Sequence, residues 1–311
     1  SWETQMSHAR AYNGARSTPT YDEGVVYHLG DLGRLAAFDA RSGDELWSLE
    51  LREEFDAEIP EYGYAESVYI EGESLYCCPA GKLAYMVCLD KHTGQVIWTN
   101  KEIDGTVGFS SLVMFNHGGY RQLAGMSSNR IFAVDSETGK LRWQVDYENR
   151  TSNNVCDPIF QDGYLFFSSG YGKGSILLNL NAYDQAKTPE TVWYTELMDN
   201  HHGGVILHEG YLYGSGHNSR GWFCLDFLTG VEIWKAGGKG SITYADQMLY
   251  CLDERGIMRL VRASPESYEA VSEFEVPDGG DGFHWAHPVV CDAVLYIRHQ
   301  DKLFAYDISY Q

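Results

Sequence analysis

Nine residues whose side chains could bind or transform a small polar molecule occur at equivalent places in six of the seven repeated segments of this 311-residue chain. The cationic members could hold a carboxylate or an oxyanion, the aromatic members could stack on a ring, and the carboxylates could accept hydroxyl protons. We predict that they line one polar pocket that binds a small polar ligand. The alternative is that they solvate a water-filled channel without a dedicated ligand. The nine are Arg16, Tyr64, Glu66, Asp157, His201, His202, Lys239, Trp285 and His287.

A divalent metal is one chemistry that this set could support. His201, His202 and His287, with Asp157 or Glu66, could ligate Zn or Mn and leave one position open for a substrate. The first candidates among them are His202, His287 and Asp157. Because neighbours along a strand point to opposite faces, we expect at most one of His201 and His202 to point into the pocket.

Acid–base catalysis without a metal is a second chemistry. Tyr64 or His202 could act as the base in a β-elimination from a uronic-acid sugar, a lyase reaction, while Arg16 or Lys239 neutralises the carboxylate. If the protein is an enzyme, the candidate catalytic residues are Glu66, Asp157, His202, His287 and Tyr64.

A repeated phrase, Asp-x-x-(Ser/Thr)-Gly-x-x-x-Trp, predicts the elements that must position these residues. Each copy follows an alternating apolar run, so it predicts a strand, a tight turn and a returning strand. The Asp can accept hydrogen bonds from the turn backbone, the Gly permits positive φ, and the Trp lies at a fixed distance along the second strand. The four full copies begin at Asp39, Asp90, Asp135 and Asp226 and end at Trp47, Trp98, Trp143 and Trp234.

Degenerate copies bring the number of repeats to seven. One runs from Asp184 to Trp193, another offers Phe274 in place of the Trp, and the last, residues 303–307, ends before its final strand. We expect the segment around Trp2 to supply that strand and so to close the last blade. The spacing of 40 to 51 residues between docking aromatics is that of a four-stranded blade. The sequence therefore predicts an all-β, seven-bladed β-propeller that forms one domain over residues 1–311.

A propeller would bring the nine residues together at one end of its central axis. In each blade the innermost strand enters near the axis, so its first residues ring the mouth of a central funnel. Alignment of the repeats on their second-strand tyrosines places one residue of each blade at a common level, and the nine come from this level and the two positions before it. Residues at the common level are Thr18, Glu66, Ser110, Asp157, Gly203, Ser241 and His287.

Composition disfavours several classes of partner. A formal net charge of −21 and a pI near 4.8 argue against binding to nucleic acid or to an anionic membrane, because phosphate neutralisation requires clustered Lys and Arg. The sequence has no apolar run of about eighteen residues that would insert into a bilayer. Nothing at Ser1 and Trp2 resembles a signal peptide, so an export signal was either removed or never present.

The seven cysteines cannot all pair within one chain, and most occur in apolar strand patterns where they behave as small hydrophobes. Cys77 and Cys78 are adjacent. In a regular strand their side chains point to opposite faces, so a disulfide between them would require a distorted turn.

The repeated phrase, preceded by strands such as those that end at Tyr27, Tyr76 and Tyr213, resembles the PQQ-like propeller repeat. That superfamily includes quinoprotein alcohol dehydrogenases and the propeller lipoprotein of outer-membrane protein assembly. Residues 168–174, 200–204, 238–244 and 286–290 are similar to segments of bacterial secreted or periplasmic propellers of this superfamily. The resemblance implies a periplasmic or secreted protein.

Three classes of function follow from these observations. The first is a binding or scaffold protein with a small polar, carbohydrate-derived ligand. The second, implied by the resemblance, is a PQQ-dependent oxidoreductase that acts on alcohols or sugars with calcium beside the quinone. Such enzymes have eight blades and a much longer chain, and no segment here matches their ligands residue by residue. The third is the metal-assisted or acid–base enzyme described above.

Overall fold

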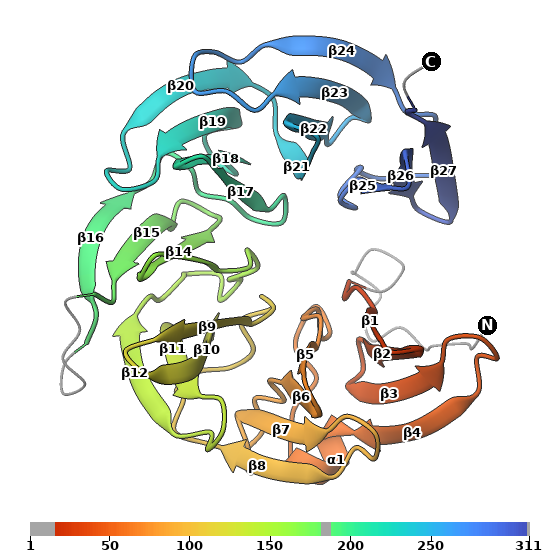
Figure 1. Ribbon diagram of the computed structural model, residues 1–311, viewed down its shortest axis with the longest axis vertical. Coiled ribbons are helices and arrows are strands. Elements are labelled where there is room, and N and C mark those ends of the chain that lie inside the picture. Colours follow the sequence, from red (N-terminus) through yellow and green to blue (C-terminus); the bar gives the residue numbers. More distant parts are fainter. Residues whose placement is uncertain (1–15, 182–187, 310–311) are drawn as a thin grey trace. The chain divides into compact units, whose positions relative to one another are not determined.

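The computed structural model describes residues 16–181 and 188–309. These residues form seven antiparallel sheets, six with four strands and one with three, and a single short helix, α1 (Leu51–Phe55) (Figure 1). This confirms the predicted fold class, an all-β, seven-bladed propeller. The seventh sheet has three described strands, as expected from the truncated last repeat. Trp2 and the strand predicted to close this sheet lie outside the described residues, as does Asp184.

The chain divides into two compact units. Unit 1 comprises Ser1–Leu165 and Asn179–Glu190, and unit 2 comprises Phe166–Leu178 and Thr191–Gln311. The division falls within the fourth sheet. A single domain over residues 1–311 stays a prediction.

Each blade is a meander whose strands follow one another in sequence order. Blades 1 to 3 lie in unit 1. Their strands are β1 (Thr20–Asp22), β2 (Val25–Leu29), β3 (Arg34–Asp39) and β4 (Glu45–Glu50); β5 (Tyr69–Glu71), β6 (Ser74–Cys77), β7 (Met86–Asp90) and β8 (Val96–Asn100); and β9 (Val113–His117), β10 (Tyr120–Met126), β11 (Arg130–Asp135) and β12 (Leu141–Asp146).

The remaining blades follow the same order. The strands of blade 4 are β13 (Ile159–Gln161), β14 (Tyr164–Ser169), β15 (Gly174–Asn179) and β16 (Glu190–Thr195). Those of blades 5 to 7, in unit 2, are β17 (Val205–His208), β18 (Tyr211–Ser215), β19 (Gly221–Asp226) and β20 (Glu232–Gly237); β21 (Gly240–Ala245), β22 (Met248–Asp253), β23 (Ile257–Arg262) and β24 (Ala270–Glu275); and β25 (Val289–Cys291), β26 (Val294–His299) and β27 (Lys302–Asp307).

Burial explains the composition of the strands. The third strands β7 and β15 are buried along almost their whole length, because other blades or loops cover both faces. The outer strands β20 and β24 are mostly exposed, and the side chain that packs inward is Trp234 in the first and Phe274 in the second. In these two strands the docking aromatic is therefore the large side chain that packs against the protein, while most of the strand is exposed to solvent.

The turn of the repeated phrase has the predicted structure. In blade 2, Asp90 Oδ1 accepts hydrogen bonds from the backbone N–H and the hydroxyl of Thr93, both at 2.8 Å, and Gly94 has a φ of 71°. The same carboxylate contact recurs at Asp39, Asp135 and Asp226. Each Asp thus stabilises the turn, and the Gly takes the left-handed conformation that other residues adopt at a cost.

The tryptophans join neighbouring blades inside each unit. In unit 1, Trp98 Nε1 donates to the carbonyl of Ser136 in blade 3 at 3.1 Å, and in unit 2, Trp234 Nε1 donates to Ser264 in blade 6 at 3.0 Å. The Trp98 ring also lies over Gly139, the glycine of the next turn. At the degenerate position, Phe274 contacts Tyr306 of blade 7 with ring centroids 4.8 Å apart, which confirms that it replaces a docking Trp.

The meander decides which loops share an edge. Because successive strands alternate in direction, the connection into each first strand and the turn between second and third strands lie at the same end of the blade. The Asp-Gly turns lie at the other end. First strands of consecutive blades contact one another, β1 with β5 and β9 with β13 in unit 1, and β17 with β21 and β21 with β25 in unit 2. Polar residues that precede these strands are thereby brought together within a unit.

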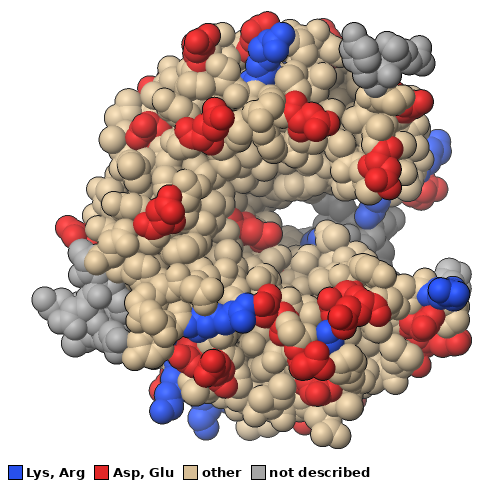
Figure 2. All heavy atoms as spheres, in the orientation of Figure 1, with Lys and Arg blue, Asp and Glu red and all other residues tan. Residues whose placement is uncertain are grey.

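Acidic side chains are spread over the face drawn in Figure 2, and Lys and Arg are fewer. Several cations in the described part of the chain pair with acids, such as Arg34 with Glu45 at 2.8 Å and Arg259 with Glu273 at 3.1 Å. Among the described residues, no helix has the length and apolarity that a bilayer crossing requires.

Candidate functional site

In unit 1, the segments that precede the first strands, which carry the residues of the predicted common level, are joined by hydrogen bonds between blades. The N–H of Thr18 donates to Ser67 Oγ at 3.0 Å, and the N–H of Ser67 donates to Ser111 Oγ at 3.2 Å. The N–H of Ser111 then donates to Asp157 Oδ1 at 2.6 Å. Asp157 is exposed and therefore both orders this edge and presents a carboxylate to solvent.

Two other predicted residues of unit 1 differ in their surroundings. Arg16 is partly exposed. Tyr64 is 1 % exposed within the hydrophobic core that contains Leu51, and its hydroxyl donates to the carbonyl of Pro79 at 2.8 Å. Burial raises the pKa of Tyr64, so its phenol stays protonated at neutral pH. This placement favours a packing role for Tyr64 over a role as base.

Glu66 is a carboxyl group buried in the protein. It is 3 % exposed, and its Oε1 accepts the backbone N–H of Cys78 at 2.6 Å. Burial, with a smaller contribution from the negative charge of Asp157, raises the pKa of Glu66 to about 7. Beside it, Cys77 and Cys78 are buried free thiols, and burial raises the pKa of both.

We expect Glu66→Gln to stabilise the protein increasingly as pH rises from 4.5 to 7. The folded-state pKa lies above the unfolded value of 4.5, so the folded protein binds more protons in this interval and the wild type loses stability as pH rises. The amide keeps the acceptor for Cys78 but cannot ionise. The difference in unfolding free energy should grow by ~3 kcal/mol and level off above pH 7. Urea denaturation of both proteins between pH 4 and pH 8 measures it, and a difference independent of pH would contradict the assignment.

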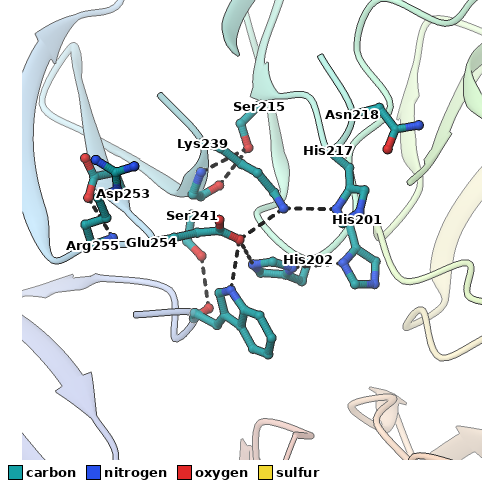
Figure 3. Close-up of polar contacts among 12 residues, drawn as sticks. His201, His202, Ser215, His217, Asn218, Lys239, Ser241, Asp253, Glu254 and Arg255 are labelled. Carbon is teal, nitrogen blue, oxygen red and sulfur yellow. Dashed lines mark hydrogen bonds and ion pairs between the residues drawn. The ribbon is translucent and has the colours of Figure 1, made fainter. Parts of the chain in front are cut away.

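In unit 2, four of the five predicted residues come together with two that sequence reasoning missed. Figure 3 labels all of them except Trp285. His201 and His202 lie before β17, Lys239 before β21 and Trp285 in the connection to β25. The missed residues lie in turns between second and third strands, which share this end of the blades. We call the six residues the Lys239 cluster: His201, His202, His217, Lys239, Glu254 and Trp285.

Lys239 is the centre of a polar network. Its Nζ donates to His217 Nδ1 at 3.0 Å and forms an ion pair with Glu254 Oε1 at 3.0 Å. Trp285 Nε1 donates to the same carboxylate oxygen at 3.0 Å. The Lys239 and Glu254 side chains are 13 % and 11 % exposed, so water screens this pair only weakly. Because the ammonium group can only donate, His217 carries its hydrogen on Nε2.

His201 and His202 both point into the cluster, which corrects the expectation that at most one would do so. Their Nδ1 atoms are 3.0 Å apart, and His202 Nε2 lies 3.9 Å from Glu254 Oε1. The alternation of side chains applies to extended strands, but both residues lie in a bend that precedes β17. Within the described part of the protein, His202 Nε2 has no hydrogen-bond partner. His287 differs, because its exposed ring contacts the backbone carbonyl of His202 at 2.8 Å.

Burial makes the imidazoles of the cluster neutral. It lowers the pKa of His201 to about 4, with smaller lowering contributions from the neighbouring His217 and from the ammonium group of Lys239. The pKa of His202 is lowered strongly, and that of His217 is also lowered, in both cases first by burial. At neutral pH the cluster therefore offers three uncharged imidazoles, which can donate or accept hydrogen bonds.

Aromatic rings flank the cluster. The Tyr171 ring contacts His201 and His217, with centroids 4.8 and 4.4 Å apart. Trp285 packs against His202 at 4.8 Å and stacks on Phe283 at 5.5 Å. Apolar faces beside a charged centre are the combination that binds sugar rings and other amphipathic ligands.

Asp199 is a positioning residue that sequence reasoning missed. It is fully buried, its Oδ2 accepts the N–H of Gly172 at 2.9 Å, and both oxygens lie within 3.1 Å of the N–H of Asn218. Its backbone carbonyl accepts the N–H of His217 at 2.9 Å. One carboxylate thereby orients the turns that carry Tyr171 and His217. Asp199 lies directly before the run Asn-His-His, the only sequence signal that could have pointed to it.

The donor sets of the two units do not fit a calcium ion with a quinone. Calcium prefers a shell of several oxygen ligands. The Lys239 cluster offers mostly imidazole nitrogens, and its carboxylate is engaged by Lys239 and Trp285. In unit 1, Glu66 has a raised pKa and its Oε1 already accepts a backbone N–H. Of the predicted Zn or Mn ligands, Asp157 lies in unit 1, and His202 and His287 lie in unit 2. That metal site stays a prediction.

Comparisons with known proteins give one family and several relatives. A family model described as "Outer membrane protein assembly factor BamB" matches residues 1–236. The quinoprotein alcohol dehydrogenase PedH of Pseudomonas putida is 30% identical over 146 residues, which cover 42% of this chain and 22% of that protein. Outer membrane protein assembly factor BamB of Shewanella oneidensis is 23% identical over 265 residues, which cover 82% of this chain and 65% of that protein.

Among solved structures, BamB from Moraxella catarrhalis superimposes with a TM-score of 0.65 and 15% identity, over 95% of this chain and 82% of that one. At this identity the likeness shows the fold alone. The chain matches only 22% of the length of PedH. A match to this segment therefore does not assign the activity of the whole dehydrogenase to this chain.

Proposed function

Because the chain belongs to the family of outer membrane protein assembly factor BamB, we propose that it works outside the cytoplasm, in the periplasm or after secretion, as a propeller that binds a small polar ligand. The ligand is carbohydrate-derived and carries an acidic group, and it binds at the Lys239 cluster. The family description supports the compartment, and the residues of the cluster support the ligand class.

The observation that carries the ligand class is the partly buried Lys239 ammonium, which lies between an imidazole and a carboxylate. An incoming carboxylate would compete with Glu254 for Lys239, where low exposure strengthens a charge-assisted hydrogen bond. The neutral imidazoles of His201 and His202 suit hydroxyl groups, because their Nδ1 atoms share one hydrogen and leave one Nε2 to accept and the other to donate. The flanking rings of Tyr171 and Trp285 suit the apolar face of a sugar.

Calorimetric titration with uronic acids and the matching neutral sugars tests this proposal. We expect uronates to bind more tightly than neutral sugars and Lys239→Gln to weaken uronate binding by about 10- to 100-fold, or ~1.4–2.7 kcal/mol. Lys235→Gln is the matched control, because Lys235 is an exposed residue of β20 whose ammonium lies 5.0 Å from the Phe223 ring. Equal weakening by both substitutions, or no preference for acidic sugars, would refute the proposal.

A second candidate is an elimination reaction at the same cluster, favoured by the buried His202 Nε2 that has no described partner. His202 would remove the proton from the carbon beside the substrate carboxylate while Lys239 holds that carboxylate. The bond between the β-carbon and its oxygen substituent would break, a carbon–carbon double bond would form, and the departing oxygen would take up a proton. Formation of the unsaturated sugar is followed by ultraviolet absorbance. Lost turnover with retained binding in His202→Gln would favour this reaction over binding alone.

A quinone-dependent oxidoreductase acting on alcohols or sugars is a further candidate, which the likeness to PedH raises. The calcium that accompanies the quinone in such enzymes does not fit the donor sets of Glu66 or of the Lys239 cluster. Addition of PQQ and calcium, with dye reduction as the readout, distinguishes this class from the other two.

A further inference from the structure

A second group of ligating side chains, made of other residues, lies at the same end of blades 6 and 7. Asp278 and His284 belong to the connection between β24 and β25, and His299 ends β26. One ligand-type atom from each of the three lies within 4.8 Å of the others. No feature of the Lys239 cluster requires these side chains, so they call for an explanation of their own.

His284 is the most unusual member of this group. It is 2 % exposed, and neither ring nitrogen has a hydrogen-bond partner in the described part of the chain. The ring cannot easily turn away, because Gly256 packs against it so closely that an added Cβ would lie 2.7 Å from Cε1. A buried imidazole without partners is costly, and a ligand at one of its nitrogens would remove that cost.

His299 and Asp278 complete the arrangement. The His299 ring stacks on His284 with centroids 3.6 Å apart, and its Nδ1 accepts the N–H of Gly279 at 2.9 Å. Its Nε2 lies 3.3 Å from the carbonyl of Gly282. Asp278 is exposed, so its carboxylate can turn toward the two rings without loss of packing.

We propose that Asp278, His284 and His299 bind one divalent ion of the zinc type. Two imidazoles and one carboxylate match zinc, whereas calcium and magnesium prefer oxygen ligands alone. Ligation at ~2.0–2.1 Å in a tetrahedron places donors roughly 3.3 Å apart. Because the lone pairs of the two stacked rings lie in nearly parallel planes, the His299 ring must turn out of the stack as the three side chains draw together. His299 gives up one of its two backbone contacts to supply a lone pair. Residues 278–284 are thereby tied to the end of β26.

The neighbouring tryptophan reports on this change. Trp285 follows His284 directly, and the N–H of His284 donates to the carbonyl of Glu254 at 3.2 Å. Movement of the connection on ion binding alters the surroundings of the Trp285 indole. This inference is independent of any ligand at the Lys239 cluster.

Zinc titration of the chelator-treated full chain, in competition with a chromophoric chelator, tests the site. We expect one equivalent to bind with a change in tryptophan fluorescence. His284→Phe, which keeps an aromatic ring but removes both ring nitrogens, should weaken binding at least 100-fold, and Asp278→Asn on the exposed residue should weaken it about 10-fold. Controls are His217→Phe in the Lys239 cluster and His92→Gln on the surface, which should bind zinc as the wild type does. Binding lost in a control but kept in His284→Phe, or no equivalent bound, would overturn the proposal.

Thermal unfolding gives an independent readout. Zinc should raise the unfolding midpoint of the wild type, because the ion binds the folded chain, and should leave that of His284→Phe unchanged. Without zinc, His284→Phe should unfold close to the temperature of the wild type, because loss of two buried nitrogens without hydrogen bonds offsets the crowding of the larger ring beside Gly256. If that variant does not fold, the fluorescence and midpoint responses of Asp278→Asn decide the outcome alone.

Discussion

Gly139→Ala is expected to lower the free energy of unfolding by about 2–4 kcal/mol. Gly139 has a φ of 71°, a conformation that costs an alanine about 1 kcal/mol. An added Cβ would also lie 2.4 Å from Cε3 of Trp98, the docking ring of the preceding blade. The ring would have to move away from blade 3, so the loss would fall on the interface between the blades. Denaturation by urea measures the change.

Two controls separate backbone strain from the clash. Gly210 has a φ of 83°, and no described atom lies within 4 Å of a Cβ added there. Gly210→Ala should therefore lower the free energy of unfolding by the cost of backbone strain alone. Trp98→Ala should cost about 3–5 kcal/mol by itself. With that ring gone, Gly139→Ala should add only about 1 kcal/mol. Full additivity of the two substitutions would show that the ring and the glycine do not interact.

Asp199→Ala is expected to lower the free energy of unfolding by about 3–5 kcal/mol and to abolish ligand binding at the Lys239 cluster. The N–H groups of Gly172 and Asn218 lose the acceptor that fixes their two turns, and the fully buried site of Asp199 is left with a cavity. Those turns carry Tyr171 and His217, so the cluster loses its geometry. Urea denaturation and uronate titration measure the two effects.

Asp199→Asn distinguishes the acceptor from the volume of the side chain. The amide oxygen at the Oδ2 position can still accept from Gly172 and Asn218, but the amide NH2 at the Oδ1 position faces the N–H of Asn218 and cannot accept from it. We therefore expect a loss between those of the wild type and the alanine variant. If the alanine variant is as stable as the wild type, Asp199 does not hold the turns. If the alanine variant is less stable than the wild type but binds uronate normally when folded, Asp199 does not position the Lys239 cluster.

Some features of the site followed from the sequence. The alignment on repeated tyrosines identified Lys239, His201, His202 and Trp285 as neighbours, because the meander sends the start of each first strand to one end. It missed His217 and Glu254, which lie in turns between second and third strands. Those turns share the same end, but their irregular backbone has no repeat spacing that would bring them into the alignment. The sequence also could not show that Tyr64 packs in the core, because burial depends on contacts between blades.

The local architecture was determined by the sequence alone. The phrase from Asp90 to Trp98 specifies its own turn, since the carboxylate bonds to residues three positions away or fewer and the glycine supplies the required φ. Repetition of that phrase specifies seven blades. Only the tertiary structure decided the chemistry of the Lys239 cluster, where the contacts join residues tens of positions apart. The neutrality of His201 and the protonation of Glu66 near pH 7 arise from burial, which exists only after the chain has folded.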